Sequence, residues 1–355
     1  MVLEATFYAS VLHLWGSRPI SQPMSSNRSD SLFLWNSVKG PYALISYNSK
    51  DKKIWFGRDP LGRKDIPDKQ DRLKFVQLED QPSSPEFLKA SRLLRVTLDD
   101  LVKRMVTGIS SLHQKTEKES RVAVLFSGGL DCTTLALLAH SHIPQSESID
   151  LLNVVNTTFD VPDRQTGERS WRELSKLTPG RDWRFVRVDV RMAEYLEHKE
   201  KIIKLMRPNL TVMDLKRTPA RVLISGLGAD KLLGGYSRHW SAFLTTSLSS
   251  NNWERLLDEL AMDLERISTR NLGRDDRMMS WFGLEVRHPL LNRRVIDLLS
   301  GLPDHGLGKG LGDNVLLRGL AHGLRLVESC RLPKRAIQFG AQSAKLDGNS
   351  KGQAG

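Results

Sequence analysis

Residues 121–133, RVAVLFSGGLDCT, constrain the fold of this chain more than any other stretch. The apolar run at 122–126 is short and continuous, which predicts a buried parallel strand covered on both faces. Gly128 and Gly129 form a turn without side chains before a predicted helix at 133–140. The free N–H groups at such a helix start favour phosphate. Asp131 would repel a bare phosphate there, so we expect an intervening Mg²⁺.

This pattern is not a Walker loop, because the spacing and the lysine of that motif are missing. The structural alternative is an ordinary glycine turn between a strand and a helix. A second segment, RVLISGLGADKLLGGY at 221–236, repeats the arrangement and places Asp230 like Asp131. Parallel strands end at one edge of a sheet, where α/β proteins bind ligands. We therefore expect Asp131 and Asp230 to share a Mg²⁺ on a nucleotide.

The alternation of apolar and helical segments predicts the fold class. Strands near 121, 149, 184 and 221 with helices between them indicate an α/β doubly wound parallel sheet. The segments after 253 have helical patterns and predict a helical C-terminal part. The predicted organisation is a β-rich segment at 1–64, a linker at 65–87, a main domain at 88–340, opened by a helix at 88–112, and a disordered tail at 341–355.

The two glycine-rich motifs resemble those of the PP-loop ATP pyrophosphatases, which split ATP between its α and β phosphates. Three further segments resemble the asparagine synthetase family within this group. They are RNLGRDDR at 270–277, EVRHPLLNRRVID at 285–297 and LPKRAIQF at 332–339. The resemblance implies adenylation of aspartate by Mg-ATP and amidation to asparagine, a ligase reaction. It places ATP contacts at Leu125, Ser127, Gly128, Gly129, Asp131, Cys132, Val154, Ser225, Gly226 and Gly228, and the metal at Asp131 and Asp230.

The N-terminal part resembles a truncated glutaminase domain of the same family, a class II glutamine amidotransferase. The resemblance lies in GPYALISY at 40–47 and WFGRDPLGR at 55–63. In the family the nucleophile is a cysteine directly after the initiator Met, where this sequence has Val2. Because that chemistry needs a thiolate beside a free amine, we expect no glutamine hydrolysis. Ammonia is then the expected amine donor.

Three departures from the family pattern bear on catalysis. Leu227 and Lys231 stand where the asparagine synthetases carry acidic residues in the second motif. The connection at 206–221 is shortened, which removes part of the aspartate pocket. The family's catalytic lysine falls at Ala336, and Lys334 and Arg335 are the expected substitutes. The alternative is a catalytically degenerate relative that binds nucleotide, or nothing, and acts through protein contacts.

Several single residues leave two interpretations open. Cys132 has either a lowered thiol pKa at the helix start or a plain packing role as a small side chain. Residues 153–156 end the second strand and could contact adenine. Asp163 lies in a stretch, VPDRQTG, that resembles a loop of unclear role. His288 suits packing better than acid–base catalysis, and no His, Cys or carboxylate spacing is typical of zinc.

Composition narrows the class of protein. The chain has 355 residues, 39% of them hydrophobic, which is enough for a buried core. Two distant cysteines and the lack of an 18-residue apolar run predict a cytoplasmic protein without a membrane span. The net charge of +12 is spread along the chain. We expect small-molecule substrates and no specific nucleic-acid binding, and a tRNA-modifying PP-loop enzyme is disfavoured; protein partners are not identified by any motif.

Overall fold

The computed structural model contains two compact units, Met1–Ile66 and Pro67–Gly355. It describes residues 43–48, 53–58, 85–109, 120–156, 161–190, 218–244, 251–268, 272–281, 283–300 and 314–332. In the first unit the described part is an antiparallel hairpin of β1 (Ala43–Asn48) and β2 (Lys53–Arg58). Both strands were expected from the sequence. Residues 65–84 of the expected linker and the tail lie outside the described residues, whereas 85–87 belong to the helix Pro85–Val106. The domain borders stay predictions.

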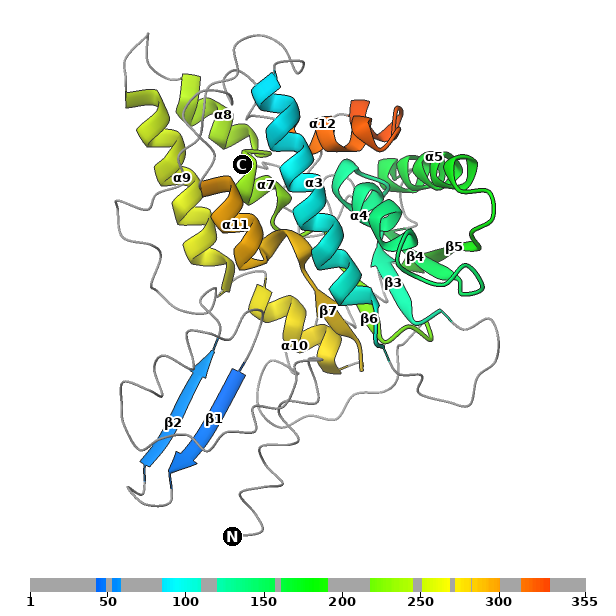
Figure 1. Ribbon diagram of the computed structural model, residues 1–355, viewed down its shortest axis with the longest axis horizontal. Helices are drawn as coiled ribbons and strands as arrows, with labels where there is room; N and C mark the ends of the chain where they lie inside the picture. Colours follow the sequence, from blue (N-terminus) through cyan, green and yellow to red (C-terminus); the bar gives the residue numbers. More distant parts are fainter. Residues whose placement is uncertain are drawn as a thin grey trace. The chain divides into compact units, whose positions relative to one another are not determined.

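The second unit is built on a five-stranded, all-parallel sheet in the order β5-β4-β3-β6-β7 (Figure 1). This confirms the predicted α/β class. The strand at its centre is the one that precedes the first glycine-rich motif. The strands are β3 (Val122–Leu125), β4 (Ile149–Asn156), β5 (Trp183–Val190), β6 (Val222–Ile224) and β7 (Glu285–Arg287).

Helices cover the sheet on both faces, as a doubly wound fold requires. α4 (Leu130–His140) and α5 (Pro162–Leu177) connect β3, β4 and β5 and pack on one face, where Phe185 stacks on Trp171. Met279 of α10 (Gly273–Trp281) packs on a cluster that includes Ala123, Leu152 and Leu223. Successive residues of a strand point to opposite faces of the sheet, and the register places this cluster on the face opposite Phe185. α10 therefore covers the second face.

The remaining helices gather beside the β6–β7 edge and above α4 (Figure 1). α3 was expected at 88–112 and occupies Pro85–Val106, with its apolar stripe buried. The others are α7 (Ala229–Leu232), α8 (Ser237–Leu244), α9 (Asn251–Ile267), α11 (Arg293–Ser300) and α12 (Val315–Gly323), with the short 3-10 turns η5 (Pro289–Leu291) and η7 (Ser329–Arg331).

Three expectations about local structure are corrected. α4 begins at Leu130 and not at Thr133, so Asp131 lies in its first turn, where the helix dipole stabilises a carboxylate. The stretch containing Asp163 is the start of α5 and not a loop. The chain after 253 is not purely helical, because Glu285–Arg287 forms the edge strand β7.

Candidate functional site

The first glycine-rich loop follows β3 and packs against α5. Gly128 has φ +80°, and a Cβ there would lie 2.5 Å from backbone atoms of Thr166 and Gly167. The hydroxyl of Ser170 donates to the Gly128 carbonyl oxygen at 2.6 Å. Gly129 caps α4 without a side-chain hydrogen bond, so no cap side chain occupies the first-turn N–H groups. Within the loop, the Gly129 amide donates to Ser127 Oγ at 3.4 Å, so the start of α4 is the part suited to an external anion.

The second loop leaves β6 and packs on the segment that follows β7. Gly228 has φ +110°, and a Cβ there would meet the Leu291 side chain at 2.5 Å. The Ser225 amide donates to the Arg287 carbonyl oxygen at 3.0 Å, and Ser225 Oγ accepts from the Leu227 amide at 3.2 Å. The sequence segment RHPLLN is thus the support of the second loop.

The two loops contact each other directly. An ideal Cβ on Gly226 would fall 2.9 Å from Asp131 Cβ and 3.5 Å from the Cys132 amide nitrogen. Only a glycine at 226 allows this approach. Asp131 of the first motif therefore packs against the second motif, as the shared sheet edge predicted.

Asp230 lies in the first turn of α7 and has a defined neighbour. Asn314 Nδ2 donates to Asp230 Oδ1 at 2.8 Å. The Gly235 amide donates to the Asp230 backbone oxygen at 2.9 Å, and a side chain at 235 would overlap the Asp230 carboxylate. The second glycine of the GGY sequence leaves the space that this carboxylate occupies.

A magnesium ion is the metal that this donor set suits. The described residues contain no group of three or more His, Cys, Asp or Glu side chains that could enclose a metal. Mg²⁺ is commonly bound by one or two carboxylates and completed by substrate phosphates and water. Asp131 and Asp230, from neighbouring loops beside a helix start, fit that mode and do not fit a closed zinc site.

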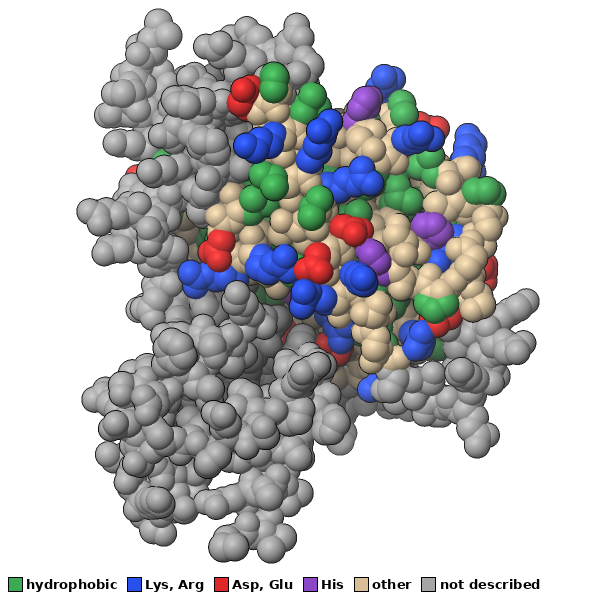
Figure 2. Space-filling model, viewed as in Figure 1, with side chains coloured by type: hydrophobic (Ala, Val, Ile, Leu, Met, Phe, Trp, Pro, Cys, Tyr) green, Lys and Arg blue, Asp and Glu red, His purple; other side chains and the backbone are tan. Residues whose placement is uncertain are grey.

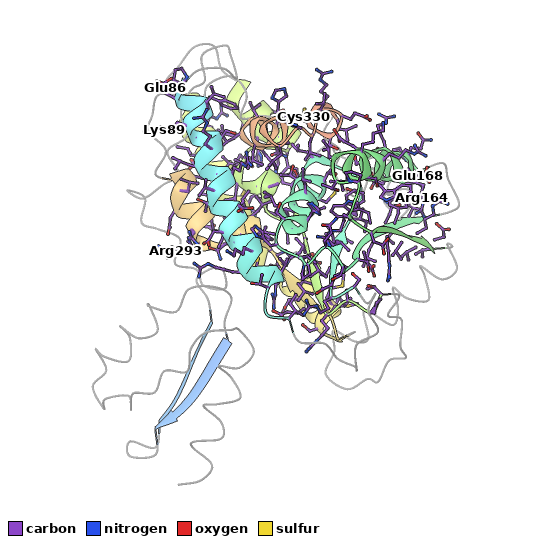
Figure 3. The ribbon with its side chains drawn as sticks, turned by 45° about the vertical axis from the view of Figure 1, so that its right-hand side comes forward. Glu86, Lys89, Arg164, Glu168, Arg293 and Cys330 are labelled. Carbon is purple, nitrogen blue, oxygen red and sulfur yellow. The ribbon has the colours of Figure 1, made fainter. Side chains whose placement is uncertain are left out.

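Residues 328–332, which lead into the segment at 332–339, are hydrogen-bonded to α5 and α12 near the first loop. The buried Glu173 carboxylate of α5 accepts hydrogen bonds from the amides of Glu328 and Ser329 at 2.7 and 3.0 Å. From α12, Arg318 donates to the carbonyl oxygens of Cys330 and Leu332 at 2.6 and 2.9 Å. Cys330 lies beside the end of α12 in Figure 3. No sequence pattern singled out Glu173, Ser329 or Arg318.

Titratable groups at the site behave as packed residues. Burial raises the pKa of the Cys132 thiol, and the Asp131 charge adds to the increase. The alternative of an activated thiol is therefore wrong, and Cys132 Sγ donates to the Gly129 carbonyl oxygen at 3.3 Å. Burial also lowers the pKa of His288 to about 4, so this ring is neutral at pH 7. A packing role for His288 agrees with that value.

Lys231 is a buried cation beside Tyr236 and Asp263. Its side chain is buried, and its Nζ lies 5.8 Å from the centre of the Tyr236 ring. Its charge also acts on Asp263 of α9, which accepts from Arg238 and, at 3.0 Å, from His239. Burial alone would raise the pKa of Asp263, but these hydrogen bonds and the Arg238 and Lys231 charges lower it overall. Asp263 thus interacts with the Lys231 charge while it is ion-paired with Arg238.

The other expected site residues are placed as follows. β4 extends through Asn156, so Asn153 is not at its end; the Asn153 amide donates to the carbonyl oxygens of Phe126 and Asp163 at 2.8 and 3.1 Å. Val154 is 44% exposed on the same strand, and Leu125 ends β3 below the first loop. Lys334, Arg335, Ala336 and most of the 206–221 connection lie outside the described residues.

Comparison with known proteins identifies the family. Residues 109–247 and 243–350 match the family model of asparagine synthase. The chain belongs to the asparagine synthase family. The matched residues include both glycine-rich motifs and the late segment. The predicted resemblance is therefore confirmed.

Two relatives of this asparagine synthase family member illustrate its range. It is 34% identical over 333 residues to asparagine synthetase domain-containing protein 1 of Gallus gallus, covering 71% of this chain and 52% of the chicken protein. It is 30% identical over 398 residues to asparagine synthetase domain-containing protein YML096W of Saccharomyces cerevisiae, covering 89% of this chain and 73% of the yeast protein. The chain spans about half the length of the chicken relative.

Among solved structures, the U34-tRNA thiolase NcsA from Methanococcus maripaludis, with its 4Fe-4S cluster, matches at 14% identity and a TM-score of 0.31. The match covers 73% of this chain and 74% of that one.

In the described part of the chain, no helix is both long and apolar enough to span a membrane. On the face shown in Figure 2, Lys and Arg side chains alternate with Asp and Glu and form no single basic stripe.

Proposed function

We propose that this asparagine synthase domain binds Mg-ATP at the two contacting loops. The observation that carries the proposal is the approach of Gly226 to Asp131 Cβ, which packs the start of α4 in one loop against the other loop. The start of α4, which has no side-chain cap, would hold phosphate oxygens. Asp131 and Asp230 would hold the metal, which when bound supplies positive charge to the leaving pyrophosphate.

The reaction class follows from the family. The side-chain carboxylate of aspartate would attack the α-phosphorus of ATP, giving an aspartyl adenylate and pyrophosphate. Ammonia would then displace AMP, giving asparagine and one proton. The chain's two cysteines, Cys132 and Cys330, are buried and burial raises the pKa of both thiols, which supports ammonia as the amine donor in this proposal.

A second candidate is a domain that binds nucleotide and turns over slowly or not at all. It is favoured by Leu227, whose side chain cannot accept a proton, and by Lys231, which packs on Tyr236 in place of an acid. In the active candidate, by contrast, Lys334 and Arg335 are the cations proposed to act on the departing pyrophosphate. We expect measurable nucleotide binding with aspartate-dependent pyrophosphate exchange that is very slow or undetectable.

One experiment separates these candidates. ATP binding to the purified chain is measured with Mg²⁺ and with EDTA, and pyrophosphate exchange into ATP is measured with and without aspartate. Mg²⁺-dependent binding without exchange supports the second candidate. Exchange at roughly 1 per second or faster would identify a working ammonia-dependent synthetase. No binding under either condition, or release of glutamate from added glutamine, would contradict the proposal.

A further inference from the structure

Asn314 is a buried residue with an unusual backbone at the start of α12. Its φ and ψ are 57° and 36°, the left-handed region, and its side chain is 1% exposed. Its backbone oxygen accepts from the Arg318 amide at 2.9 Å, but its side chain makes no capping hydrogen bond to the helix. The amide group is therefore turned to another use.

The Asn314 side-chain amide donates a hydrogen bond to the carboxylate of Asp230. Nδ2 of Asn314 reaches Asp230 Oδ1 at 2.8 Å across 84 residues of sequence. Oδ1 of Asn314 is buried without a hydrogen-bond partner and lies 2.8 Å from where a Gly235 Cβ would be. Three separate parts of the chain, α7, the GGY turn and the start of α12, thus fit together around one carboxylate.

An amide donor affects a carboxylate differently from a lysine or an arginine. It fixes the rotation of the carboxylate through one oxygen, but it is neutral and leaves the negative charge in place. Groups that orient a metal ligand in this way contribute to metal affinity although they do not touch the metal. Asn is also one of the few residues that accept a left-handed backbone, so conformation alone is the competing explanation for its presence.

We propose that Asn314 is a positioning residue that orients Asp230 toward the magnesium ion of bound Mg-ATP. The inference rests on the proposed function, because it assigns a role within that same site. It predicts that loss of the Asn314 amide weakens the Mg²⁺ dependence of nucleotide binding, while binding of ATP without metal is unchanged.

The test uses Asn314→Gly, which keeps the left-handed backbone without strain and removes the amide. The matched control is Arg325→Gly, at the other left-handed position of the same helix region, with φ 65° and an exposed side chain. The Mg²⁺ concentration for half-maximal ATP binding should rise about tenfold in Asn314→Gly and stay unchanged in Arg325→Gly. ATP affinity in EDTA should equal that of the wild type in both variants.

A double-variant cycle separates positioning from general damage. In an Asp230→Asn background, Asn314→Gly should cause no further change in the Mg²⁺ requirement, since it acts through that carboxylate. Equal Mg²⁺ requirements in the wild type and Asn314→Gly would overturn the inference and leave the proposed function standing. Absence of Mg²⁺-dependent binding in the wild type would overturn both.

If Asn314→Gly does not fold, the exchanged pair Asp230→Asn with Asn314→Asp decides the question. This double variant keeps the hydrogen bond, the volume and the net charge, but moves the carboxylate to position 314. We expect a Mg²⁺ requirement raised about tenfold. Wild-type Mg²⁺ dependence in the exchanged pair would show that the orientation of the pair is irrelevant and that the inference is wrong.

Discussion

The hydroxyl of Ser170 donates to the carbonyl oxygen of Gly128 at 2.6 Å, although 42 residues separate them. This bond ties the first glycine-rich loop to α5. The same helix carries Gly167, whose backbone fills the space where a side chain at 128 would lie. The shape of the loop is therefore determined by α5 as well as by its own sequence.

Replacing Gly128 with alanine should disrupt this contact. The control is Gly108→Ala, because Gly108 also has a positive φ, +72°, but nothing lies within 4 Å of its modified position. We expect Gly108→Ala to cost about 1 kcal/mol of unfolding free energy from backbone strain. Gly128→Ala should cost roughly 2 kcal/mol more and abolish ATP binding, because backbone atoms must move. Equal urea midpoints for the two variants would contradict the described packing.

The shared-metal arrangement predicts parallel effects at two carboxylates. Asp131→Asn and Asp230→Asn should each weaken Mg-ATP binding by ~1 to 3 kcal/mol. The double variant should lose less than the sum of the two, because both act on one ion. Asp297→Asn, at an exposed ion pair with Arg293, is the control and should bind normally. Unchanged affinity in both single variants, measured by calorimetry, would exclude the model.

Glu173 should contribute to stability through the late segment. Glu173→Gln weakens the acceptor for the Glu328 and Ser329 amides, so we expect a loss of about 1 to 3 kcal/mol in unfolding free energy. Glu168→Gln on the same helix is the control, labelled beside Arg164 in Figure 3. Glu168 pairs with Arg172 and Arg187 near the surface, and its loss should cost less than about 1 kcal/mol. Similar losses in both variants would argue against the anchoring role.

The pKa of His288 predicts a pH dependence of stability. Since its pKa falls from 6.5 to about 4 on folding, the unfolded chain binds the proton more tightly. The contribution is complete above pH 6.5 and is lost as the pH falls toward 4. Between pH 7 and pH 5, the wild type should lose about 2 kcal/mol more than His288→Leu. Parallel pH profiles in urea unfolding would show that His288 is not buried in the neutral form.

Restoring an acid at position 231 should be unfavourable in this chain. Lys231→Glu would place a second carboxylate near the buried Asp263, and we expect a loss of about 3 kcal/mol in unfolding free energy. Adding Asp263→Asn should recover part of that loss, which a double-variant cycle measures. Full stability of Lys231→Glu alone would show that the two positions do not interact.

The sequence was sufficient where a local pattern carries the information. Continuous apolar runs followed by glycines located β3, β6 and the two loops, because buried parallel strands need such runs and close loop contacts need glycine. The edge strand β7 has only the residues Glu285, Val286 and Arg287, which give no apolar run, and its pairing with β6 determines its conformation.

The supporting residues could not be predicted because their partners lie far away in sequence. Glu173 meets Ser329 across 156 residues, and Asn314 meets Asp230 across 84. Neither pair has a characteristic spacing. One signal was available, since the two glycines of GGY, four and five residues after Asp230, indicate that something must approach the backbone closely there.

The residues at positions 226 and 235 should differ between related proteins that bind nucleotide and those that have lost nucleotide binding. Gly226 leaves room for Asp131 Cβ and the start of α4, and Gly235 leaves room for the Asp230 carboxylate. If a lineage stopped binding nucleotide, selection would no longer keep side chains out of these positions, and larger residues would accumulate there. A relative with both glycines intact but altered acids elsewhere would be one that still holds a ligand and has changed its chemistry.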